Sequence, residues 1–99
     1  MDLQERQEVY SAAIEKWGST AQIEMLQEES TELALAARKF MRKGNPETYN
    51  SLIGELADVE IMIEQMKLMF PSAETEINLQ KDFKINRLKG RIETNTFTE

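Results

Sequence analysis

The sequence predicts an all-α fold, a four-helix bundle-like domain with antiparallel helices. The chain has 99 residues, of which 40% are hydrophobic and 30% charged, and it contains four Gly and two Pro. This composition is typical of a helical globule with one modest core. Apolar residues recur at helical spacing in four segments, and the short turn signals between them place successive helices antiparallel. We therefore expect one domain over residues 1–99.

A single glycine separates the first two predicted helices. The first helix runs from about Leu3 to Trp17, and its expected apolar side comprises Val9, Tyr10, Ala13, Ile14 and Trp17. Ser19, followed three residues later by Gln22, predicts a capping box that opens a second helix. That helix continues to about residue 43. The negative end of the helix dipole stabilises the basic side chains in its last turns, and Gly44 ends the helix.

A proline marks the start of the third helix. In "GNPE", Asn45 is the expected N-cap and Pro46 the first helical residue. This helix runs to about Phe70. Ser72 is the expected cap of a fourth helix that ends near residue 91 or 92. We expect residues 93–99 to form a flexible tail.

The residue types that the chain lacks narrow its chemistry. It contains no Cys and no His, which excludes thiolate catalysis, a Ser-His-Asp triad and zinc sites built on sulfur or imidazole. The net charge of −6 lies within residues 1–70 and argues against a polymeric nucleic acid as partner. No apolar run is long enough to span a bilayer, and the charged start is unlike a signal peptide. We therefore expect a cytoplasmic protein without a membrane partner.

The second predicted helix carries acidic residues beside its apolar stripe. The stripe lies within about 40° of Leu26 on a helical wheel and comprises Leu26, Leu33, Ala37 and Phe40. Glu29 lies roughly 60° to one side, and Glu32 roughly 120° to the same side. Glu28 lies further toward solvent.

The third predicted helix repeats this pattern. Its stripe lies within about 40° of Leu52 and comprises Leu52, Leu56, Val59, Ile63, Met66 and Phe70. Glu55 lies roughly 60° to one side, and Asp58 roughly 120° to the same side. If the two helices pack antiparallel by these stripes, both acidic pairs border one cleft.

The energetic cost of these positions indicates a metal ion. A carboxylate in an apolar stripe is costly to ionise, and four gathered carboxylates repel one another. In these two helices Lys and Arg lie mostly at the ends. A hard cation, Mg²⁺ or alternatively Mn²⁺, binds carboxylate oxygens and is commonly completed by water and phosphate. The simpler alternative is a set of solvated charges beside the core.

Two short motifs carry a family resemblance. "EESTE" is followed by "ELAD", with 22 residues between Glu32 and Glu55. Around them stand "EKWG", "ADVEIMIEQMKLMF" and a late K-x-x-R-L-K-x-R element. In order and spacing this pattern resembles the E-E-x-x-E … E-x-x-D signature of the MazG-like, all-α nucleoside triphosphate pyrophosphohydrolases. The resemblance covers residues 10–92 in outline.

The resemblance implies a MazG-type fold and a reaction. A nucleoside or deoxynucleoside triphosphate would be hydrolysed with Mg²⁺ to the monophosphate and pyrophosphate, in nucleotide-pool control or house-cleaning. The implied metal ligands are Glu29, Glu32, Glu55 and Asp58. Glu28 matches the first Glu of the motif and would either hold a further metal ion or orient the attacking water.

The basic fourth helix and the single Trp are candidate substrate contacts. Lys84 and Arg87 lie within about 60° of each other on the wheel. They either extend around a narrow apolar edge or contact substrate phosphates or a neighbouring subunit, and the resemblance favours phosphate. Trp17 either packs in the core or stacks on a base.

A second apolar set on the third helix predicts a partner. Ala57, Ile61 and Leu68 lie on the side away from Leu52. A helix that is apolar on two sides needs two neighbours, and we expect one of them to be another subunit of a homodimer or homotetramer. The alternative to an enzyme is a non-enzymatic acidic helical module that binds a basic partner protein.

Overall fold

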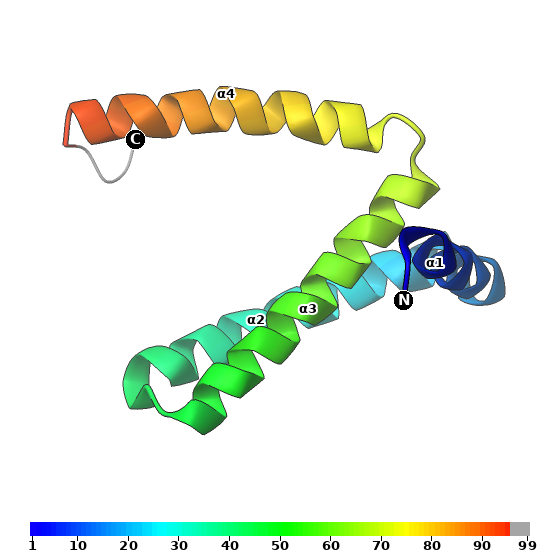
Figure 1. Cartoon of the computed structure of the whole chain (residues 1–99), viewed down its shortest axis with the longest axis horizontal. Helices are drawn as coiled ribbons and strands as arrows, with labels where there is room; N and C mark the ends of the chain where they lie inside the picture. Colours follow the sequence, from blue (N-terminus) through cyan, green and yellow to red (C-terminus); the bar gives the residue numbers. More distant parts are fainter. Residues whose placement is uncertain (96–99) are drawn as a thin grey trace.

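The computed structural model describes residues 1–95 and shows four helices (Figure 1). They are α1 (Leu3–Trp17), α2 (Ser19–Lys43), α3 (Pro46–Met69) and α4 (Ala73–Glu93). The described residues contain no strand. The predicted all-α class and the order of the helices are confirmed. Residues 96–99, which belong to the predicted flexible tail, lie outside the described residues.

Two glycines end helices as the sequence predicts. Gly18 has φ 88° and donates its N–H to the Ile14 carbonyl at 2.8 Å. Gly44 has φ 57° and donates its N–H to the Phe40 carbonyl at 2.8 Å. Positive φ is costly for residues with a Cβ, so glycine makes both turns without strain.

The caps at the helix starts agree with the prediction at one helix only. At α3 the Asn45 side chain accepts from the Thr48 N–H at 2.8 Å, and Pro46 is the first helical residue. At α2 the predicted capping box is wrong, because the turn at Gly18 makes Ser19 already helical and no side chain caps the helix. At α4 Ser72 occupies the N-cap position, but its hydroxyl donates to Glu76 at 2.5 Å instead of accepting from the backbone.

The centre of the fold is an antiparallel hairpin of α2 and α3 (Figure 1). Helix α1 lies across the end of the hairpin that is remote from the α2–α3 turn and contacts both of its helices. The Tyr10 hydroxyl on α1 donates to Glu64 Oε1 on α3 at 2.5 Å. Few of the side chains in residues 1–95 are buried, and they are Tyr10, Gln22, Ala36, Met62 and Gln65.

The helix α4 stands apart from this core. Among the described elements it contacts only α3, and none of its residues is buried (Figure 1). Its apolar residues fall on two sides, since Ile77 and Leu88 lie roughly 180° from Leu79 on the wheel. It therefore has no single apolar stripe to seat against α3. The described residues form a three-helix core with a projecting helix, not a closed four-helix bundle.

Both apolar sides of α3 remain partly exposed. In the main stripe Leu56 is 41% exposed, Ile63 37% and Phe70 46%. In the second set Ile61 is 40% exposed and Leu68 38%, and Ala57 and Ile61 line a hollow together with Tyr10 of α1. The described residues therefore cover neither side of α3 completely.

Candidate metal centre

The inward direction of each hairpin helix can be read from its buried residues. On α2 the buried Gln22 and Ala36 lie seven residues before and after Glu29. On α3 the buried residues are Met62, seven residues after Glu55, and Gln65, ten residues after it. Seven residues bring a side chain back to within about 20° of the same direction, so Glu29 points in the buried direction of α2, whereas Glu55 lies at one edge of the buried side of α3.

Three carboxylates from the two helices meet between them. One carboxylate oxygen from each of Glu29, Glu32 and Glu55 lies within 4.8 Å of the others. Glu29 and Glu55 are half-buried, and Glu32 is exposed. The Oε2 atoms of Glu29 and Glu55 are buried and accept no hydrogen bond. These two oxygens have lost water without gaining a donor from the described residues.

The surroundings of Glu29 and Glu32 disfavour the ionised form of both carboxyl groups. Burial raises the pKa of Glu29 from 4.5 to about 6, and the negative charges of Asp58, Glu32 and Glu55 add to this shift. The charge of Glu55 is the largest cause that raises the pKa of Glu32, followed by desolvation and the charges of Glu28 and Asp58. Every neighbouring charge that shifts these two groups is negative.

The remaining acidic residues of the two motifs lie around this cluster. Asp58 is exposed, yet its charge acts on both Glu29 and Glu32. Glu28 is also exposed and acts on Glu32. The fold therefore brings Glu29, Glu32 and Glu55 together, with Asp58 at their border and Glu28 outside.

The residues present suit a hard divalent cation. The donors are carboxylate oxygens alone, which Mg²⁺ and Mn²⁺ prefer. A buried carboxylate oxygen without a hydrogen bond is costly, and a cation would remove that cost and the mutual repulsion together. The donor set and the two unpartnered oxygens thus both fit a metal ion.

A groove extends from the cluster along the hairpin. It has a volume of about 410 Å³ and is lined by Glu32, Leu35, Ala36, Lys39, Lys43, Asn45, Glu47, Thr48, Ser51 and Glu55. Sequence reasoning treated the lysines only as helix-end charges. Lys39 follows Glu32 by seven residues, about two helical turns, so it lies on the same face of α2. This spacing was the sequence signal that could have placed Lys39 beside the acidic cluster.

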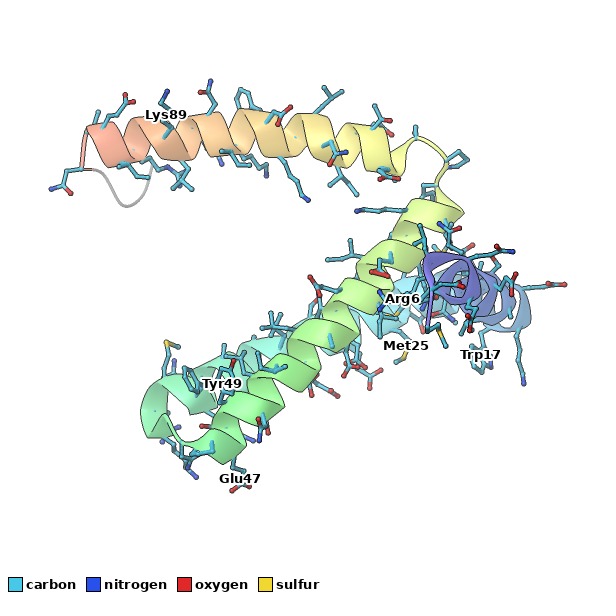
Figure 2. The ribbon with its side chains drawn as sticks, in the orientation of Figure 1. Arg6, Trp17, Met25, Glu47, Tyr49 and Lys89 are labelled. Carbon is cyan, nitrogen blue, oxygen red and sulfur yellow. The ribbon has the colours of Figure 1, made fainter. Side chains whose placement is uncertain are left out.

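Three other predicted site residues do not line this groove. Lys84 and Arg87 are on α4, which contacts no hairpin helix other than α3. Trp17 is 62% exposed at the end of α1, with the Lys16 ammonium 5.5 Å from its ring centroid (Figure 2). The core alternative for Trp17 is therefore wrong, while a contact with a base stays a prediction.

No protein-family model matches the chain, and no curated protein or solved structure is similar to it. No described helix combines the length and the apolar character needed to cross a membrane. The resemblance to MazG-like enzymes thus rests on the motif residues alone.

Proposed function

We propose that the protein is a Mg²⁺-dependent nucleoside triphosphate pyrophosphohydrolase that releases pyrophosphate and a nucleoside monophosphate. The observation that carries the proposal is the meeting of Glu29, Glu32 and Glu55 within 4.8 Å. The buried, unpartnered oxygens of Glu29 and Glu55 strengthen it. The order of the motifs, similar to that of the MazG-like enzymes, supplies the reaction class.

Each acidic residue has a role in this proposal. Glu29, Glu32 and Glu55 hold Mg²⁺, or Mn²⁺ in its place, and Asp58 completes the set. Such an ion neutralises phosphate oxygens and lowers the pKa of a bound water. The ligands extend from two packed helices, so the helix pairing fixes the spacing of their backbones. Glu28, at the outer edge, orients the attacking water or holds a further ion.

The groove suits a small anionic substrate. Its volume of about 410 Å³ lies within the range of small-molecule sites. Bound cations reverse the local charge of an acidic pocket, so phosphates are accepted where carboxylates alone would repel them. Carboxylates that extend from two packed helices suit phosphoryl-type chemistry, which depends chiefly on positioning and charge neutralisation.

The protein acts as a homodimer or homotetramer in this proposal. The exposed side chains of Leu56, Ile63 and Phe70 and the unburied α4 present apolar surface that the described residues leave uncovered. In the stretch 81–91, α4 carries five basic residues against one acid, whereas the hairpin is acidic. Helix α4 of one subunit can therefore cover the stripe of the next, bringing Lys84 and Arg87 toward a second chain.

The acidic side chains of the hairpin also favour a second candidate, a non-enzymatic module that binds a basic partner protein. The two functions differ in their response to Mg²⁺. An enzyme gains thermal stability with Mg²⁺ and releases pyrophosphate, whereas a module of this kind does neither.

The test is a panel of standard and modified nucleoside triphosphates, with pyrophosphate release and melting temperature measured with and without Mg²⁺. We expect Mg²⁺-dependent release from at least one triphosphate. Glu55→Gln should lose both the release and the stabilisation by Mg²⁺, and the control Glu60→Gln, on the same helix, should keep both. Absence of pyrophosphate from the whole panel, with Mn²⁺ as well, would exclude the enzyme.

A further inference from the structure

The groove beside the acidic cluster has two chemically different ends. Glu32 and Glu55 line one end, and Lys39 and Lys43 line the other, near the α2–α3 turn. Neither lysine forms an ion pair with any other described residue. Glu47 is the remaining charged residue of the lining. Three carboxylates against two ammonium groups give the lining one net negative charge, and Lys39 and Lys43 supply all of its positive charge.

Helical geometry directs the lysines toward the acids. Lys39 lies seven residues after Glu32, a rise of roughly 10 Å along α2. Side chains of a helix lean toward its N-terminus, so the Lys39 side chain leans back toward the acidic end. Lys43 follows one turn later. From α3, Ser51 adds a hydroxyl one turn before Glu55.

We infer that Lys39 and Lys43 bind the terminal phosphates of the substrate, so that the triphosphate tail points toward the α2–α3 turn. This inference rests on the proposed function and adds a direction of binding to it. Phosphates bridged to Glu32 and Glu55 by a cation would extend toward the two ammonium groups, with Ser51 as a hydroxyl donor. The nucleoside then lies toward the α1 end of the hairpin. The phosphate contacts come from the same chain as the acids, not from Lys84 and Arg87.

The binding test separates the two ends of the ligand. Isothermal titration with Mg²⁺–tripolyphosphate should show affinity reduced about tenfold or more in Lys39→Gln/Lys43→Gln, because two charge-assisted contacts are lost. Binding of a Mg²⁺–nucleoside monophosphate should change less than twofold, since it lacks the terminal phosphates. The matched control is Arg38→Gln/Arg42→Gln, which removes the same charge from the same turns of α2 without touching the groove lining.

The possible outcomes test the role of the two lysines separately from the enzyme proposal. If wild type releases pyrophosphate but Lys39→Gln/Lys43→Gln binds tripolyphosphate as wild type does, the inference is overturned and the enzyme stands. If Lys84→Gln/Arg87→Gln shows the selective loss instead, α4 binds the phosphates and the inference fails. If no triphosphate is hydrolysed but the lysine pair still controls tripolyphosphate binding, the enzyme proposal fails and the groove stands as a polyphosphate site.

Discussion

Glu29 on α2 and Glu55 on α3 meet across the helix pair, and each buries a carboxylate oxygen that accepts no hydrogen bond. Helix pairs ordinarily place apolar side chains at such positions, because uncompensated carboxylates oppose folding. The hairpin thus carries a local cost at the place where Glu32 and Asp58 also gather. A bound cation would remove this cost, so binding at the site can be followed through the free energy of unfolding.

Neutralising Glu29 should stabilise the metal-free protein. At pH 7.5, Glu29→Gln should raise the free energy of unfolding by about 1 kcal/mol, after the shift in its pKa is discounted for partial solvent screening. Glu29→Leu should raise it as well. Urea denaturation in chelator measures the change, and Glu24→Gln on the same helix is the control. A destabilised Glu29→Gln would show that the charged form is favoured in the fold.

Stability without metal should fall as pH rises through the acid range. The folded pKa of Glu29, about 6, lies above its ordinary value of 4.5, and the pKa of Glu32 is also raised. Between about 4.5 and 6 the folded state binds more protons than the unfolded state, so the free energy of unfolding decreases with rising pH. Melting temperatures from pH 4.5 to 7.5 should show this slope, and Glu29→Gln should flatten it.

Saturating Mg²⁺ should change the sign of that slope, since metal and protons compete for the same oxygens. If the wild-type slope is unaffected by Mg²⁺, the cluster does not bind the ion.

The hydrogen bond between Tyr10 and Glu64 should hold α1 to the hairpin. Tyr10→Phe removes a contact to a charged acceptor and should destabilise the fold by about 1–2 kcal/mol. The same hydrogen bond is the main reason that the pKa of Tyr10 is raised above 10. Urea denaturation measures the loss. Tyr49→Phe, which keeps the ring contact with Phe40, is the control and should be nearly neutral.

Two glycines should respond oppositely to alanine. Gly44→Ala places a Cβ at φ 57° and should cost about 1 kcal/mol of stability. Gly54 lies inside α3, where an added Cβ meets no atom of another element within 4 Å, so Gly54→Ala should stabilise by about 0.5 kcal/mol. Thermal denaturation of both variants tests the turn. Equal effects would contradict the left-handed conformation at Gly44.

A charge on the uncovered α3 stripe should separate the subunits. Ile63→Lys/Phe70→Lys should convert the proposed oligomer to monomers in light scattering coupled to gel filtration, because each buried lysine would lack a partner. Both positions are exposed within one chain, at 37% and 46%, so the hairpin should still fold. Leu3→Lys, at a position 70% exposed, is the control. A wild-type monomer at micromolar concentration would contradict the proposal.

Local signals predicted the helices well. Gly18, Gly44 and the Asn45–Pro46 pair determine conformations within one or two turns, so their effects can be read without knowledge of the fold. Ser19 was assigned wrongly because the glycine before it also permits a direct entry into the helix. Figure 2 shows Tyr49 and Glu47 emerging from different sides of α3, as helical spacing requires.

Direction within the core was harder to predict. The apolar stripes placed Glu29 beside the buried side of α2, whereas the buried residues Gln22 and Ala36 show that Glu29 points in that direction. The apolar arc on each of the hairpin helices is wider than the surface that one neighbouring helix covers. The sequence therefore allows several rotations of the helix about its own axis, and the positions of the other helices decide which one the fold adopts. Whether Lys39 lines the groove depends on the rotation of α2 about its axis, which the sequence alone does not determine. Helix α4 stands apart from the core because its apolar residues do not form one stripe.

The projection of α4 has a consequence for how the chain acquires its structure. A helix of 21 residues that contains no buried residue gains little from tertiary packing, which is the main source of helix stability in proteins. Its order must then come from whatever covers it. If another copy covers it, helix content becomes linked to protein concentration, and dilution would lower far-ultraviolet ellipticity before it disturbed the hairpin.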